Sequence, residues 1–164
     1  MYSKFIKALL LFAAFLLQYS LVQKLSIFSF TANLCVLALV GVSYFSRPAE
    51  AAAYGAVLGL LMDGAAGRGF GFQLLLCMYL AVAVKLIASE KINNSPAFMA
   101  MFMWLFTFMY YLAYGLFSAV VPGGSITPGR WLITAAVTAS VNMIISLPLL
   151  WAAEKRLRRR VVNE

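Results

Sequence analysis

Six long apolar runs, separated by short polar breaks, constrain this chain more than any other feature. A bilayer core is about 30 Å thick, and about 20 helical residues are needed to cross it. The chain is 64% hydrophobic and only 11% charged, whereas a soluble domain carries about 25% charged residues to cover its surface. The sequence therefore predicts an all-α integral membrane protein, a six-transmembrane-helix bundle. The runs cover residues 5–22, 27–45, 51–66, 72–88, 97–121 and 131–153.

The apolar runs leave little chain outside the predicted membrane. We expect residues 1–154 to form one transmembrane domain and residues 155–164 to form a basic cytoplasmic tail. The first run begins as a secretory signal peptide would, but residues 18–22 are a poor cleavage site. We therefore expect this run to remain as the first span. Residues 67–71 could break a helix inside the membrane, which is tolerated only beside protein or a water-filled cavity.

Lysine and arginine residues are divided unequally between the two sides of the predicted bundle. With six spans both termini share one side, and that side carries ten basic residues against three on the other. Because basic loops stay in the cytoplasm, we expect a multi-pass protein with both termini cytoplasmic. The ten are Lys4, Lys7, Arg47, Lys85, Lys91, Lys155, Arg156, Arg158, Arg159 and Arg160, and the three are Lys24, Arg68 and Arg130.

Several functional classes are disfavoured by the residues that the chain lacks. Histidine is absent and only five carboxylates are present, so imidazole acid–base chemistry is excluded and an enzyme is not expected. Cys35 and Cys77 lie inside apolar runs without further ligands nearby, so buried free thiols are favoured over a metal site or a disulfide. No cofactor is expected. The net charge of +8 follows membrane topology, and no nucleic-acid partner is expected.

Gly55, Gly59 and Asp63 are spaced four residues apart and therefore share one helix face. Glycines at this spacing let a second helix approach closely. Asp63 is the one carboxylate embedded in an apolar run, and such residues face the bundle interior or mark function. It could accept hydrogen bonds from the backbone of residues 67–71 or pair with Arg68. Two interpretations remain open, a structural clamp and a proton or ion transport site.

A second polar pattern lies in the last apolar run, where Thr134, Thr138, Asn142 and Ser146 recur every four residues. These side chains can form hydrogen bonds to neighbouring helices. They could also line a small polar cavity. Pro148 follows, and it is expected to kink the helix.

The segment from Gly55 to Gly71 resembles the rod shape-determining protein MreD family, whose signature is a Gly-x3-Gly-x3-Asp seam followed by a short glycine-containing loop. The length, span count and basic tail are also similar to those of the family. Residues 30–34, at the start of the second run, are a further match, except that Ala32 stands where the family often has proline. Asn142 followed by Pro148 resembles the last span of the family.

This resemblance implies a non-catalytic scaffold of the cell-elongation complex in the bacterial cytoplasmic (inner) membrane, which acts in cell shape and peptidoglycan synthesis. The implied partner is the bitopic protein MreC, and through it MreB filaments and the synthase pair of RodA with a class B penicillin-binding protein. Gly55, Gly59, Asp63 and Gly71 match the motif. Their implied role is to shape helix packing and the cytoplasm-distal loop on which the partner docks.

The same resemblance supplies a rival, because the family's fold is similar to the substrate-binding subunits of energy-coupling-factor transporters. In that hypothesis the chain binds a small molecule, and Asp63 with the stripe from Thr134 to Ser146 lines the pocket. Such subunits often carry small-residue motifs on their first span for coupling. The first run here is dominated by leucine and phenylalanine, which favours the scaffold.

Overall fold

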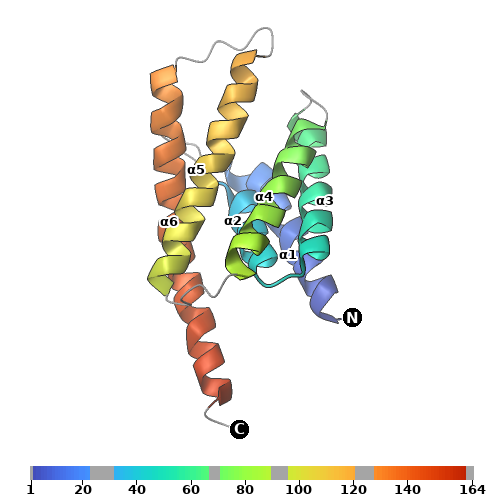
Figure 1. The fold of residues 1–164 in the computed structure, drawn as a ribbon, viewed down its shortest axis with the longest axis vertical. Helices are drawn as coiled ribbons and strands as arrows, with labels where there is room; N and C mark the ends of the chain where they lie inside the picture. The colour runs from blue at the N-terminus through green and yellow to red at the C-terminus, as the bar shows by residue number, and fades with distance from the viewer. Residues whose placement is uncertain (1, 23–31, 67–70, 90–95, 121–127, 162–164) are drawn as a thin grey trace.

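The computed structural model describes residues 2–22, 32–66, 71–89, 96–120 and 128–161 of the chain. The described residues form six α-helices, and the first of them ends in a short π-helical turn (Figure 1). Because each helix satisfies its own backbone hydrogen bonds, this is an architecture that a bilayer tolerates. The elements are α1 (Tyr2–Leu17), η1 (Gln18–Val22), α2 (Leu34–Tyr44), α3 (Pro48–Ala66), α4 (Phe72–Ser89), α5 (Pro96–Val120) and α6 (Pro128–Val161).

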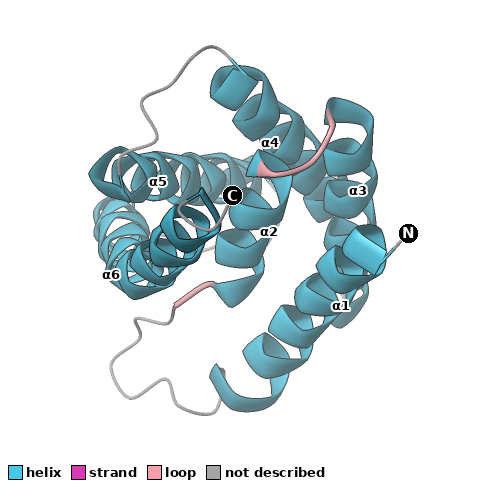
Figure 2. Ribbon diagram, turned by 90° about the horizontal axis from the view of Figure 1, so that it is seen from below, coloured by secondary structure: helices cyan, strands magenta, loops and turns pink. Residues whose placement is uncertain are grey.

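The helices form two groups that lie side by side. Helices α5 and α6 make an antiparallel pair, and α1 to α4 form the second group (Figures 1 and 2). The most extensive contacts are between α3 and α4 and between α5 and α6, whereas α2 and α4 provide most of the links between the groups. Helix α1 begins and α6 ends at the same end of the molecule, with α6 extending beyond the other helices (Figure 1).

Two of the described helices are long and apolar enough to cross a membrane, judged by length and composition. These segments are Phe98–Ala119 and Gly129–Pro148. Helix α2 has 11 residues, which at about 1.5 Å per residue cover about half of a bilayer core. The six helices of the described residues agree in number with the six predicted spans.

The helix boundaries differ from the apolar runs at two places. The second run was predicted to be helical from residue 27, but Ala32 and Asn33 are not helical and α2 begins at Leu34. The Asn33 side chain caps α2 instead, because asparagine favours the N-cap over a helix interior. Helix α6 continues through Pro148 to Val161, so the basic tail begins as an extension of the last helix. The predicted break at residues 67–70 and the pairing with Arg68 lie outside the described residues.

The apolar core is centred on α2. Its buried residues include Val36, Leu39 and Val40, which contact side chains from the surrounding helices. Both cysteines are buried and free, as predicted from their apolar surroundings. The central position of such a short helix means that its N-terminus lies inside the bundle, where its backbone N–H groups need partners.

Candidate functional site

Helices α3 and α4 approach each other closely along the face that carries Gly55 and Gly59. A Cβ atom at Gly55 would lie 2.5 Å from the backbone oxygen of Cys77, and one at Gly59 would collide with the backbone of Gln73 and Leu74. These neighbours are backbone atoms, which cannot move aside as the end of a flexible side chain can. The two glycines therefore define a seam in which two helix backbones are in direct contact.

Asp63 lies at the end of this seam and is only 1% exposed. Its Oδ2 atom accepts hydrogen bonds from the backbone N–H groups of Gly71 at 2.9 Å and Leu74 at 3.0 Å, and its Oδ1 atom accepts one from Gln73 at 3.0 Å. These three donors are the free N–H groups at the start of α4. A carboxylate is also favoured there by the helix dipole. Asp63 of α3 therefore caps α4 from a different helix.

Gly71 explains why the cap comes from another helix. The residue precedes the first residue of α4, and its carbonyl oxygen accepts a hydrogen bond from Leu75 N at 3.1 Å. It therefore occupies the N-cap position, but glycine has no side-chain oxygen to serve as acceptor. Its φ angle of 95° is one that other residues rarely adopt. The turn thus requires glycine, and Asp63 supplies the missing acceptor.

Asn142 of α6 forms the second buried polar contact and is fully buried. Its Oδ1 atom accepts a hydrogen bond from Asn33 N at 2.9 Å, and its Nδ2 atom donates to Asn33 O at 3.1 Å. Nδ2 also lies 3.4 Å from Thr107 Oγ1 on α5. Asn142 therefore satisfies both backbone polar groups of Asn33, which lies just before α2.

Two further N–H groups at the start of α2 are satisfied by the side chains of Asn33 and Gln18. Asn33 Oδ1 accepts from Val36 N at 3.1 Å, and Gln18 Oε1 accepts from Leu34 N at 2.8 Å. Asn33 Nδ2 donates to the hydroxyl oxygen of Tyr111 at 3.2 Å. Groups from η1, α5 and α6 thus meet at the N-terminus of α2 and make its position inside the bundle possible.

A polar cavity of about 380 Å³ lies between these two polar contacts. Gln73 belongs to the wall of the cavity and to the Asp63 cap, while Asn33 belongs to the wall and to the Asn142 contact. Tyr110 donates to Gln73 Oε1 at 2.9 Å. The wall carries hydroxyl and amide groups but no ionisable acid or base besides tyrosine. Its residues are Tyr19, Asn33, Met62, Ala65, Ala66, Gln73, Tyr110, Tyr111 and Tyr114.

The structure divides the predicted site residues between two places. Gly55, Gly59, Asp63 and Gly71 belong to the seam between α3 and α4, and Asn142 belongs to the contact with Asn33. Their role in binding a partner stays a prediction.

Two residues of the predicted polar stripe other than Asn142 donate hydrogen bonds to backbone oxygens of α6 itself. Thr134 donates to Arg130 O and Ser146 donates to Met143 O, whereas Thr138 is buried. None of the four stripe residues, Asn142 included, is among the residues that line the polar cavity. The stripe therefore does not line this cavity, and its place in a ligand pocket stays a prediction.

Several residues of the site were not singled out from the sequence. Gln18, Gln73 and Tyr110 are polar groups inside apolar runs, and this was the one signal that could have identified them. Gly115 was also missed, although a Cβ there would collide with the indole ring of Trp131. The Trp131 ring of α6 therefore packs directly on the backbone of α5 at Gly115. Its Nε1 atom donates a hydrogen bond to Tyr111 O at 3.0 Å.

Taken together, these features define a helical membrane protein whose buried polar side chains cap helix ends and join helices. Among the described residues, no three histidine, cysteine, aspartate or glutamate side chains are grouped as metal ligands. The sequence profile of the rod shape-determining protein MreD family matches residues 2–158. The chain belongs to the MreD family, as the glycine and aspartate motif indicated. No curated protein and no solved structure matches it.

Membership of this family establishes the general role of the chain. The family acts in rod shape determination, is located in the membrane and is non-catalytic, so the chain is not an enzyme. Its members belong to the rod-shape complex. The contacts of Asp63 agree with a structural role, because the three hydrogen bonds that described residues donate to it come from the backbone of Gly71 and of the first turn of α4.

Proposed function

We propose that this chain is a scaffold of the bacterial cell-elongation complex and that it binds MreC directly. Through MreC it helps control peptidoglycan synthesis by RodA and its class B penicillin-binding protein along MreB filaments. The family match supports a place in this complex. The observation that carries the proposal is the preformed cavity next to the Asp63 cap, whose walls are held by hydrogen bonds between different helices.

The proposed orientation places all six helices across the inner membrane with both termini in the cytoplasm. Lys4, Lys7, Arg47 and Lys85 belong to the end of the bundle where α1 and α3 begin, whereas Arg130 belongs to the opposite end, at the start of α6. This arrangement follows the distribution expected of a membrane protein with cytoplasmic basic ends. The Asp63 cap and the polar cavity then face away from the cytoplasm.

The cavity suits a segment of a partner because it is polar, neutral and rigid. Its wall offers hydroxyl and amide groups that can pair with backbone groups of an incoming chain. A preformed surface also lowers the entropic cost of binding. We therefore propose that a membrane-proximal segment of MreC occupies this cavity, and that the glycine seam fixes the distance between the helices that form its walls.

The alternative is a small-molecule-binding subunit of an energy-coupling-factor type transporter. The cavity volume of about 380 Å³ lies within the range of about 300–1,000 Å³ typical of ligand pockets. The similarity to the fold of those subunits stays a prediction. A saturable increase in melting temperature with a vitamin-sized ligand, and no capture of MreC, would favour this alternative.

The first test is co-purification with a tagged MreC in mild detergent. Wild type is compared with the double variant Gly55→Leu/Gly59→Leu, which forces the helix backbones apart. The matched control is Gly64→Leu/Gly129→Leu, because a Cβ at either of these glycines would meet nothing within 4 Å. We expect capture of MreC by wild type and by the control, and loss of capture by the seam variant. Failure of wild type to capture MreC would overturn the proposal.

A further inference from the structure

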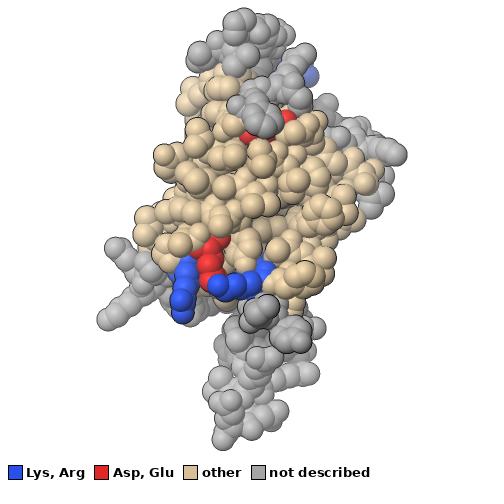
Figure 3. Space-filling view, turned by 90° about the vertical axis from the view of Figure 1, so that its right-hand side faces the viewer, with Lys and Arg blue, Asp and Glu red and all other residues tan. Residues whose placement is uncertain are grey.

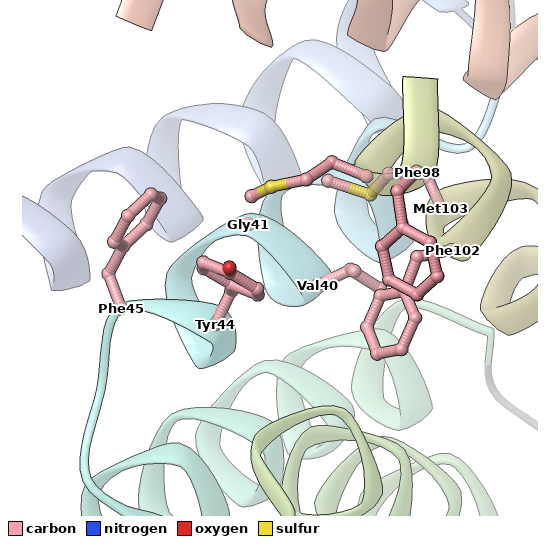
Figure 4. A pocket seen from close by; sticks show the side chains of 8 residues that line it. Val40, Gly41, Tyr44, Phe45, Phe98, Phe102 and Met103 are labelled. Carbon is pink, nitrogen blue, oxygen red and sulfur yellow. The ribbon is translucent and has the colours of Figure 1, made fainter. Parts of the chain in front are cut away.

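A narrow apolar groove lies between α2 and α5, toward the end of the bundle where α2 terminates. It is lined by aliphatic, methionine and aromatic side chains. Figure 4 shows Phe98, Phe102 and Met103 of α5 on one side, with Tyr44 at the end of α2 and Phe45 just after it on the other. The groove encloses about 30 Å³. This space admits about one methylene or methyl group, and it is too small for an aromatic ring.

Gly41 keeps the groove open. A Cβ at this position would meet only the terminal methyl of Met103, at 3.8 Å. The missing side chain therefore leaves space on the surface of α2, and no other helix backbone fills it. At the end of the groove, Phe45 exposes 59% of its surface. A small apolar groove between α2 and α5 therefore ends at an exposed aromatic ring.

Two lysine ammonium groups lie at this end of the groove. Lys7 Nζ of α1 donates to Phe45 O at 2.6 Å and to Ser46 Oγ at 3.0 Å. Lys85 Nζ of α4 lies 3.4 Å from Tyr44 O. Tyr44 and Phe45 both line the groove. The two ammonium groups therefore contact the backbone oxygens of residues that form it. They also stabilise the negative C-terminal end of α2.

Both ammonium groups keep donors for another ligand. An ammonium group has three N–H donors, and among the described residues Lys7 uses two of them and Lys85 uses one. The nearby carboxylate of Glu50 is bound to Lys4 at 2.8 Å. Basic and acidic atoms gather at this end of the described surface (Figure 3). With Arg47 adjacent, four basic residues share this end with one carboxylate among the residues that the structure describes.

We propose that this groove is a binding site for an anionic phospholipid, which goes beyond the proposed function and does not depend on it. The phosphate lies against Lys7 and Lys85, and an acyl chain lies against the apolar residues of the groove, with one of its methylene groups in the space beside Gly41. Charge complementarity selects an anionic headgroup over a zwitterionic one. The adjacent apolar groove selects a lipid over free phosphate, because burial of methylene groups adds to the electrostatic attraction.

The test is native mass spectrometry of the full chain in a neutral detergent with added phosphatidylglycerol or phosphatidylcholine. We expect wild type to retain one phosphatidylglycerol and to bind it at least about tenfold more tightly than phosphatidylcholine. Lys7→Gln/Lys85→Gln should remove this preference. Lys7→Arg/Lys85→Arg should keep it, because the positive charges remain. The comparison of the two variants therefore distinguishes the loss of charge from a failure to fold.

The groove itself is tested with Gly41→Leu, which fills the space beside Met103. Gly64→Leu is the matched control, because position 64 is exposed and a Cβ there meets nothing within 4 Å. We expect weaker phosphatidylglycerol binding in Gly41→Leu and unchanged binding in Gly64→Leu. Equal retention by wild type, Lys7→Gln/Lys85→Gln and Gly41→Leu would overturn the proposal. Loss in the lysine variant alone would also overturn it, because it would indicate surface attraction without a groove.

Discussion

Asn142 of α6 pairs with the backbone of Asn33 through two hydrogen bonds, at 2.9 Å and 3.1 Å, across 109 positions of the sequence. Its side-chain oxygen thereby supplies the acceptor that the N–H group of Asn33 would have found in a preceding helical turn, and its NH₂ group adds a second donor to Asn33 O, which also accepts from Leu37 N. This contact lets the chain enter α2 in the middle of the bundle without leaving polar backbone groups unpaired. It also joins the α5–α6 pair to the other four helices.

Replacement of Asn142 by leucine should destabilise the protein strongly. The change leaves the buried N–H group of Asn33 without its partner, which costs about 1–3 kcal/mol, and it leaves the C=O group of Asn33 with the hydrogen bond from Leu37 N alone. We expect a loss of about 1–4 kcal/mol in the free energy of unfolding, measured by thermal unfolding in detergent. Thr134→Ala is the control, since its hydroxyl bonds only within α6. Equal melting temperatures for the two variants would contradict the assignment.

Asp63→Asn should loosen the first turn of α4. An asparagine amide offers one acceptor oxygen, and its NH₂ group then faces at least one of the three N–H donors that Asp63 now binds. We expect faster hydrogen exchange at the amides of Gly71, Gln73 and Leu74, and a lower yield of the complex with MreC. Cys35→Ala, at a buried thiol in the core, is the comparison. Equal complex yields at equal membrane levels would argue against a role of the cap in assembly.

Gly59→Ala should be costly although it adds a single methyl group. The new Cβ would collide with the backbone of Gln73 and Leu74, so the helices must separate. Overpacking of this kind costs about 1–3 kcal/mol. Gly64→Ala should have the opposite effect, because a Cβ at that position meets nothing within 4 Å. The higher helix propensity of alanine should then stabilise the protein by about 0.5–1 kcal/mol. Melting temperatures that shift in the same direction for both variants would refute the seam.

The ion pair between Lys4 and Glu50, at 2.8 Å, should make the contact of α1 with α3 dependent on pH. The hydrogen bond from Lys4 lowers the pKa of Glu50 below its usual 4.5, and the same bond raises the pKa of Lys4 above its usual 10.5. The stabilisation is therefore present between these values. It is lost as pH falls through the lowered pKa of Glu50, or rises through the raised pKa of Lys4.

Because Lys4 is exposed and Glu50 remains in part accessible to solvent, the effect on stability is small. Glu50→Gln should lower the melting temperature slightly near neutral pH and leave it unchanged in acid, where Glu50 of the wild type is protonated. A difference between wild type and variant that persists unchanged at low pH would show that the carboxylate charge is not responsible.

The sequence predicted the features that depend on local spacing. The glycine and aspartate residues of α3 share one face because the helix period puts them there, and the close approach of α4 follows from the absence of side chains. The predicted start of the second helix at residue 27 was wrong for Ala32 and Asn33, because its true start at Leu34 depends on Asn142, far along the chain.

The cavity could not be predicted for a similar reason. Gln73 and Tyr110 lie in separate apolar runs and bond only because α4 and α5 meet at that level. The partner of Asp63 was predicted as the backbone of residues 67–71 or as Arg68. The bond from Gly71 N confirms the first alternative for that residue, and Arg68 lies outside the described residues. The bonds from Gln73 N and Leu74 N were not predicted; they form because the free N–H groups at the start of α4 attract a carboxylate.

The central claim, that a segment of MreC docks in the polar cavity, is tested most directly by filling that cavity. Binding of labelled MreC to the chain in nanodiscs is measured for wild type, Ala66→Trp and Gly64→Trp. Ala66 lines the cavity, whereas Gly64 on the same helix is exposed and does not line it. We predict a Kd for MreC at least about tenfold weaker for Ala66→Trp, equivalent to about 1.4 kcal/mol, and unchanged for Gly64→Trp. Equal affinity of all three proteins for MreC would contradict the claim.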